Sequence, residues 1–156
     1  MKPGDLVADF TLPDQDDKPR TLSDLLGGGP VVLFFYPAAM SGGCTAESCH
    51  FRDLAAEFAE VGAQRVGISA DPVAKQHEFA EVNSFDYPLL SDADGVVAAQ
   101  FGVKRRFGPI PVKRHTFVIG TDRRLVGVVR SEFRMDSHAD QALAVLRKAA
   151  AGSAGS

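Results

Sequence analysis

Apolar and polar blocks alternate along the chain in a way that predicts a series of short strands. The apolar runs cover residues 6–12, 31–36, 65–70, 87–92, 115–120 and 125–131. The run VVLFFY over residues 31–36 is continuously apolar and rich in β-branched and aromatic side chains. Such a run is typical of a central strand that is buried on both faces of a sheet.

Apolar residues at helical spacing predict helices between these strands. The predicted helices cover residues 23–26, 44–62, 71–82, 95–102 and 137–150. Ser23 is expected to cap the first of them, and Asp71 the third, with Pro72 at its first helical position. Gly62 is expected to end the helix that begins near residue 44.

The order of these elements predicts an α/β fold. Strands and helices alternate first, and an antiparallel hairpin with a closing helix follows, so a mixed sheet with helices on both faces is expected. A thioredoxin-like core has this order. No internal repeat or linker divides the chain, which predicts a single domain over residues 1–148. The small residues of 149–156 are expected to form a flexible tail.

Composition excludes several classes of partner. The chain has 156 residues, of which 45% are hydrophobic and 24% charged, with a net charge of −3. This charge offers no footprint for nucleic acid or for an anionic membrane, and neither partner is expected. The N-terminus lacks the apolar segment of an export signal, and the apolar stretch 31–40 is too short to span a bilayer. A cytoplasmic location is therefore expected.

The chain contains two cysteines, Cys44 and Cys49. In a reducing compartment they are expected to be catalytic, metal-binding or simply buried rather than a permanent cross-link. Cys44 lies just after the predicted central strand and near the start of its helix, where active sites of such sheets lie. The free N–H groups and the positive dipole end of a helix favour a thiolate there.

Helical phase separates the two thiols. Residues 44, 51 and 58 share one helix face with the apolar stripe, so Cys44 is expected to point inward. Cys49 lies about 140° around the helix, on the side of Arg52, and is expected nearer to solvent. Helix geometry places the two Cα atoms roughly 8.6 Å apart. A disulfide needs less than about 7 Å, so the helix must unwind before the thiols can bond.

Two other interpretations of these cysteines need no redox chemistry. A buried cysteine often packs as a small apolar side chain, which would suffice for Cys44. A metal site could recruit Cys44, Cys49, His50 and His77. The two cysteines face apart, however, and both histidines are accounted for as ordinary helix residues.

The segment FFYPAAMSGGCTAESCHFRD resembles the active-site segment of peroxiredoxins. Their pattern of proline, three residues, threonine or serine, two residues and cysteine is met by Pro37, Ser41 and Cys44. The second cysteine five positions later, followed by FRD, resembles the peroxiredoxin Q or bacterioferritin comigratory protein subgroup. Further similar segments are GDLVADFTLPDQD, GISAD, YPLLSD and RHTFVI, and the resemblance covers about residues 3–148.

The resemblance implies a thioredoxin-like fold and a thiol-dependent peroxidase acting on hydrogen peroxide and organic hydroperoxides. Cys44 matches the peroxidatic cysteine that becomes a sulfenic acid, and Cys49 the resolving cysteine that condenses with it to a disulfide. A thioredoxin-type dithiol would then reduce this disulfide. Arg114 matches the arginine that faces the thiolate, Pro37 the residue that shields the pocket and Ser41 the hydroxyl that orients peroxide. No metal, haem or flavin is implied, and the subgroup indicates a monomer.

Two readings from other classes of protein predict different behaviour. A thioredoxin-like disulfide carrier is disfavoured by Pro37, Ser41 and the wide cysteine spacing. A non-catalytic domain with buried thiols predicts that Cys49 is inaccessible to alkylation.

Three details of the sequence carry separate expectations. Gly42 stands where the subgroup often has proline, so the first helical turn is expected to unwind more easily. Glu47, one turn after Cys44, is expected to oppose formation of the thiolate weakly. The basic residues 104–106 are expected to be solvated surface.

Overall fold

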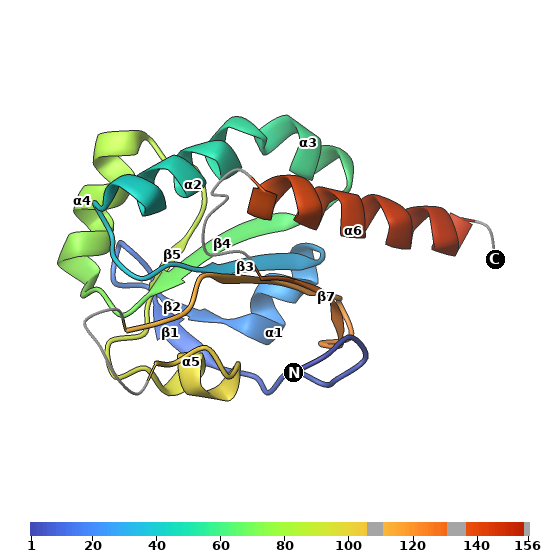
Figure 1. Ribbon diagram of the computed structural model, residues 1–156, viewed down its shortest axis with the longest axis horizontal. Helices are drawn as coiled ribbons and strands as arrows, with labels where there is room; N and C mark the ends of the chain where they lie inside the picture. The colour runs from blue at the N-terminus through green and yellow to red at the C-terminus, as the bar shows by residue number, and fades with distance from the viewer. Residues whose placement is uncertain (106–110, 131–136, 155–156) are drawn as a thin grey trace.

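The computed structural model describes residues 1–105, 111–130 and 137–154 (Figure 1). The strands are β1 (Thr11–Pro13), β2 (Pro19–Thr21), β3 (Val31–Phe35), β4 (Gln64–Ser69), β5 (Leu89–Ser91), β6 (His115–Ile119) and β7 (Leu125–Arg130). The helices are α1 (Leu22–Leu25), the 3-10 turn η1 (Leu26–Gly28), α2 (Gly42–Asp53), α3 (Ala55–Glu60), α4 (Val73–Asn83), α5 (Val96–Gln100) and α6 (Ser137–Ala154). The predicted alternation of strands and helices is confirmed.

β3 lies at the centre of a five-stranded mixed sheet with the order β5-β4-β3-β6-β7. It pairs in parallel with β4 and antiparallel with β6, and β6 pairs antiparallel with β7. β1 and β2 form a separate antiparallel hairpin. The expected mixed sheet is therefore present, with the predicted buried strand at its centre.

Helices cover both faces of the sheet. Figure 1 shows α2, α3, α4 and α6 on one face, and α1, α5 and the β1–β2 hairpin on the other. Side chains of β3 alternate between the faces: Val32 and Phe34 pack in the core beneath α2 and α6, whereas Leu33 and Phe35 pack in the opposite core. A short loop, residues 36–41, connects the end of β3 to the start of α2.

The N-terminal segment differs from its prediction. The expected strand over 6–12 is limited to Thr11–Pro13, with a single isolated bridge from Leu6 to Arg124. Ser23 does not cap α1, because the helix begins at Leu22 with Thr21 as its N-cap residue; the Ser23 hydroxyl donates to Asp9 Oδ2 at 2.7 Å. Contacts with other parts of the chain, rather than the alternation of apolar and polar residues within 6–12, determine the conformation of this segment.

The long helix predicted over 44–62 begins at Gly42 and divides into α2 and α3 at Leu54. Arg65 of β4 supplies the physical reason. Its Nη1 donates to the carbonyl of Phe51 at 3.0 Å and to that of Arg52 at 3.5 Å, and it takes over acceptors at the end of α2.

The ends of two further helices differ from expectation. Pro72, not Asp71, is the N-cap of α4, because the Asp71 carboxylate accepts from Ala39 N–H and from the Ser69 hydroxyl, both at 2.7 Å. α6 continues to Ala154, so residues 149–154, expected in a flexible tail, are helical.

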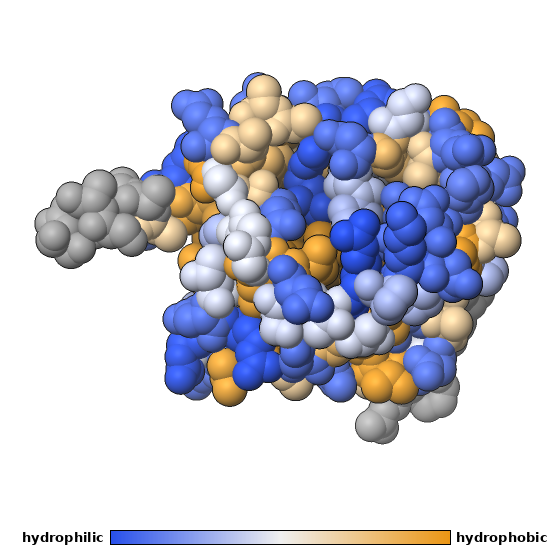
Figure 2. Space-filling view, turned by 180° about the vertical axis from the view of Figure 1, so that it is seen from behind, coloured by the Kyte–Doolittle hydropathy of each residue, from blue (hydrophilic) through white to orange (hydrophobic). Residues whose placement is uncertain are grey.

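Polar side chains cover most of the face shown in Figure 2, with hydrophobic ones in small groups between them. Within the described ranges, none of the helices is long and apolar enough to cross a bilayer.

Candidate active site

Both cysteines lie in α2, and the predicted difference between them is confirmed. Cys44 is in the first turn and fully buried, whereas Cys49, further along the same helix, is partly exposed. Both are free thiols. Partial exposure of Cys49 does not fit the reading in which both thiols are buried and inert.

Arg114 is directed at Cys44, as expected. Its Nη2 donates to Cys44 Sγ at 3.2 Å, and its Nη1 donates to Glu47 Oε1 at 3.0 Å. Burial alone would lower the pKa of Arg114, but the negative charges of Glu47 and Cys44 outweigh it and raise that pKa above its ordinary value. A fixed guanidinium against the sulfur stabilises a thiolate there.

Glu47 has a different role from the weak opposition expected of it. Its side chain is fully buried, and it holds one arm of the Arg114 guanidinium while the other arm faces the sulfur. His138 Nε2 lies 3.6 Å from Glu47 Oε2, and His138 Nδ1 lies 2.8 Å from Thr116 Oγ1. A chain of buried polar groups therefore runs from Cys44 to Thr116.

The sequence contains a signal for these additional residues. Arg114 directly precedes β6 and Thr116 is its second residue, so extended backbone would turn both side chains to the same side of the sheet. His138 shares one side of α6 with the buried residues Ala142 and Leu146, at four-residue spacing. Phase could have placed Thr116 and His138 on the buried faces of their own elements, but not against Glu47.

Hydrogen bonds and a left-handed residue fix the loop between β3 and α2. Ala39 N–H donates to the Asp71 carboxylate at 2.7 Å, and Met40 takes a left-handed conformation with φ of 68°. Ser41 is the N-cap residue of α2, and its backbone carbonyl accepts from Thr45 N–H at 2.9 Å. These contacts fix where the first turn of α2 begins.

Ser41 and Pro37 both lie in this loop and are partly exposed. The Ser41 hydroxyl donates to the carbonyl of Ala38 at 2.8 Å, so it must turn to donate to a bound molecule. The orienting role of Ser41 and the shielding role of Pro37 stay predictions.

Cys49 rests against the end of α4. Its Sγ lies 3.6 Å from Asn83 Oδ1, and the neighbouring Arg52 donates to the carbonyl of Asn83 at 2.7 Å. Both cysteines belong to one uninterrupted helix, whose geometry holds their Cα atoms roughly 8.6 Å apart. A bond between them requires part of α2 to unwind.

A metal interpretation receives no support from the side chains. His50 contacts Asp140 at 2.9 Å, and His77 contacts Asp16 and Glu81 on the surface. Over residues 1–105, 111–130 and 137–154, no group of three or more His, Cys, Asp or Glu side chains is placed to hold a metal ion.

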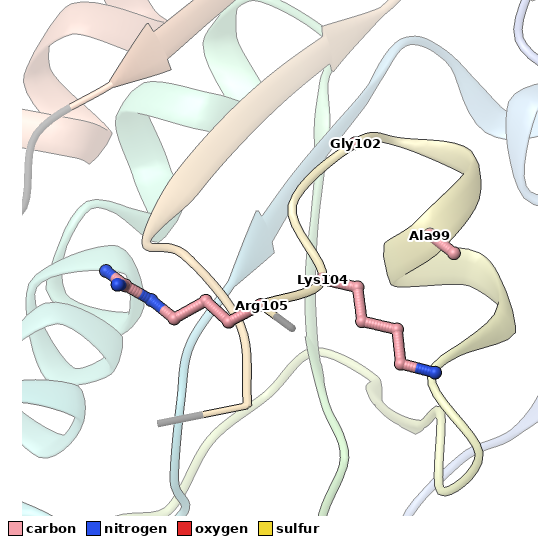
Figure 3. A pocket seen from close by; sticks show the side chains of 4 residues that line it. All are labelled: Ala99, Gly102, Lys104 and Arg105. Carbon is pink, nitrogen blue, oxygen red and sulfur yellow. The ribbon is translucent and has the colours of Figure 1, made fainter. Parts of the chain in front are cut away.

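A cavity of about 510 Å³ lies beside the basic residues Lys104 and Arg105. Their side chains point in opposite directions (Figure 3), and Lys104 Nζ donates to the carbonyl of Asp94 at 3.2 Å. The two charges do not converge on a common ligand. Arg106 lies outside the described residues.

Comparison with known proteins identifies a family whose profile covers most of the chain. The profile of the AhpC/TSA family matches residues 3–128. The crystal structure of peroxidoxin BcpB from Mycobacterium tuberculosis is 70% identical, with a TM-score of 0.91 over 95% of this chain and 97% of that one.

Two other relatives are more distant. Peroxiredoxin Bcp of Escherichia coli is 37% identical over 95% of this chain and 97% of its own length. A structure of the bacterioferritin comigratory protein of Xanthomonas campestris, studied for alkyl peroxide reduction, is 29% identical, with a TM-score of 0.82 over 90% of this chain and 92% of that one.

Proposed function

Because this chain belongs to the AhpC/TSA family, with peroxiredoxins of the Q and Bcp kind as its relatives, we propose that Cys44 is its peroxidatic cysteine and Cys49 its resolving cysteine. The fold is thioredoxin-like, and the activity is that of a thiol-dependent peroxidase. One observation above all supports the assignment of Cys44. Its sulfur is buried in the first turn of α2 and accepts a hydrogen bond from the Arg114 guanidinium.

In the first step the Cys44 thiolate attacks one oxygen of the peroxide. The S–O bond forms as the O–O bond breaks, sulfur is oxidised to sulfenic acid, and the other oxygen leaves and takes up a proton to become water or an alcohol. Negative charge grows on the leaving oxygen. Arg114, the Ser41 hydroxyl and the N–H groups that open α2 are the donors that would stabilise it.

In the second step the Cys49 sulfur attacks the Cys44 sulfenic sulfur. A disulfide forms and hydroxide leaves, which becomes water on protonation. Since both thiols lie in α2, this step needs no second subunit, but it needs the helix to unwind locally. Condensation also protects Cys44 from further oxidation.

The disulfide is reduced by two thiol exchanges with a thioredoxin-type dithiol, which regenerates both thiols and leaves the reductant oxidised. A monomer in the cytoplasm is sufficient for this cycle. The alkyl peroxide reduction associated with the X. campestris relative makes organic hydroperoxides candidate substrates beside hydrogen peroxide.

The decisive experiment adds one equivalent of hydrogen peroxide to the fully reduced protein. Quenched samples are analysed for free thiols and for intact mass. Fast loss of two thiols with an intramolecular bridge is expected. Oxidation as slow as that of free cysteine would overturn the proposal.

Two variants separate the roles of the cysteines. Cys44→Ser should abolish peroxide reduction. Cys49→Ser should still form a sulfenic acid that a dimedone probe traps, but should not turn over with thioredoxin. Undiminished thioredoxin-driven turnover of Cys49→Ser would show that Cys49 is not the resolving residue.

A further inference from the structure

His138 is a fully buried histidine of α6 that contacts the thiol site through Glu47. Its Nε2 lies 3.6 Å from Glu47 Oε2 on α2, and its Nδ1 lies 2.8 Å from Thr116 Oγ1 on β6. α6 thereby joins the residues that surround Cys44, although it begins 93 positions after that cysteine in the chain (137 minus 44).

The chemistry of the two neighbours determines the proton on the ring. A carboxylate only accepts hydrogen bonds, so the contact with Glu47 favours the tautomer that carries the proton on Nε2. In the neutral ring Nδ1 is then an acceptor, and the Thr116 hydroxyl donates to it. Each nitrogen thus has a neighbour suited to one tautomer.

The effect of this ring reaches the reacting sulfur through two intervening residues, Glu47 and Arg114. Glu47 has one carboxylate oxygen toward His138 and the other bonded to Arg114 Nη1, while Arg114 Nη2 is bonded to Cys44 Sγ. Because Glu47 Oε2 lies 3.6 Å from His138 Nε2, a polar contact longer than a hydrogen bond, the ring restrains the rotation of the carboxylate without bonding it. The guanidinium that it holds therefore keeps a fixed direction.

Resting on the peroxidase function proposed above, we propose that His138 is a positioning residue of the thiol site: its Nε2–H steadies Glu47, which aims Arg114 at Cys44. The surrounding side chains of α6 favour this role over simple packing. Ala142 and Leu146 on the same side of the helix are small or apolar, and a buried imidazole among them is costly unless its nitrogens have polar neighbours.

Two substitutions of His138 test whether its contact with Glu47, rather than its contact with Thr116, positions the site. In His138→Gln the amide nitrogen can take the place of Nε2 and still donate to Glu47, whereas the shorter side chain of His138→Asn reaches only the Thr116 side. Both should be made in the Cys49→Ser background, so that Cys44 is the sole thiol. His77→Asn, on the exposed surface of α4, is the matched control.

The readout compares two reactions of the same sulfur. The second-order rate with hydrogen peroxide depends on the aim of Arg114, whereas alkylation by iodoacetamide needs only an accessible thiolate. His138→Asn should lower the peroxide rate about 10-fold and alter alkylation by less than about 3-fold. His138→Gln and His77→Asn should stay within about 3-fold of the parent in both reactions.

Equal losses in the Gln and Asn variants, or an unchanged peroxide rate in His138→Asn, would overturn the proposal. If His138→Asn does not fold, Thr116→Val decides, since it removes only the hydroxyl that orients the ring. It should lower the peroxide rate about 3-fold with little effect on alkylation, and no change would count against the proposal. A slow reaction of the parent itself would instead refute the assigned peroxidase site.

Discussion

The guanidinium of Arg114 meets the sulfur of Cys44 at 3.2 Å across 70 positions of the sequence. Strand pairing brings the two residues together. Arg114 directly precedes β6, whose Thr116 lies opposite Phe34 near the end of β3, and the chain leaves β3 for the helix that carries Cys44. The sheet register therefore places a positive charge beside the Cys44 sulfur.

Replacing Arg114 by lysine should test what the forked guanidinium adds to its charge. A lysine ammonium is a single point of charge and cannot face Cys44 and Glu47 along two fixed directions. Arg114→Lys should lower the second-order rate with hydrogen peroxide about 100-fold in single-turnover measurements. Arg130→Lys, an exposed change on neighbouring β7, should leave the rate unaltered. A rate of Arg114→Lys within about 3-fold of the parent would show that charge alone suffices.

Much of the site could be predicted from local pattern. The buried run 31–36, the inward phase of Cys44 and the outward phase of Cys49 follow from periods of two and of 3.6 residues. The match to a known motif pointed to Arg114. These predictions succeed because each depends on a short stretch of chain or on one motif.

The remaining features depend on contacts between distant segments. Glu47 was expected only to oppose the thiolate weakly, because the sequence does not show that Arg114 and His138 lie against it. The division of the predicted long helix depends on Arg65, which reaches it from β4. Asp71 looked like a helix cap but is engaged by Ala39 of another loop.

The β1–β2 hairpin should make stability sensitive to acid through Asp14. Burial alone would raise the pKa of Asp14, but hydrogen bonds from Arg20 and from the N–H groups of Lys18 and Asp16 lower it below its ordinary value. A carboxyl whose pKa is lower in the folded than in the unfolded state stabilises the fold above the unfolded value, about 3.9. This contribution is lost as the pH falls below that value toward the folded pKa.

Urea unfolding of the protein and of Asp14→Asn should show this dependence. At pH 7 the variant should have the lower free energy of unfolding, and the difference should shrink as the pH falls from about 4 to 3. Asp24→Asn removes an exposed carboxylate from the nearby α1 and should show no comparable trend. A difference between Asp14→Asn and the parent that stays constant with pH would contradict the assignment.

The Tyr87 hydroxyl holds the middle of α2, and removing that hydroxyl should speed formation of the disulfide between Cys44 and Cys49. Its buried hydroxyl donates to the carbonyl of Ser48 at 2.7 Å, next to Cys49. Tyr87→Phe should lower the free energy of unfolding by about 1 kcal/mol and increase the rate of the second step about 2- to 5-fold. Quenched samples resolved by intact mass would measure that rate, since the chain has no tryptophan to report it.

Ile68→Val provides a control of similar cost for Tyr87→Phe. It removes one methylene group from the core on the opposite face of the sheet and should also destabilise the fold by about 1 kcal/mol. It should leave the rate of disulfide formation unchanged, because it does not touch α2. If both variants accelerate the second step equally, general loosening rather than release of Ser48 is the cause.

Gly42→Pro, at the first residue of α2, should slow disulfide formation rather than speed it. Gly42 is the first residue of α2, where proline is favoured, and a Cβ added there meets no atom within 4 Å. Ser41 before it is already extended, with ψ of 153°, as a residue preceding proline must be. Proline should therefore stabilise the helix start by about 0.4–1 kcal/mol through the unfolded state.

The kinetic consequence of Gly42→Pro should be confined to the second step. Reaction of Cys44 with peroxide should stay within about 3-fold, while disulfide formation slows about 2- to 5-fold as the first turn resists unwinding. The longer-lived sulfenic acid should then give more sulfinic acid at high peroxide, detected as a mass increase of two oxygens. Gly27→Ala, which also has space for a Cβ but lies in η1, should leave both steps as they are. An unchanged rate of disulfide formation in Gly42→Pro would mean that the helix unwinds beyond its first turn, where Tyr87 holds it.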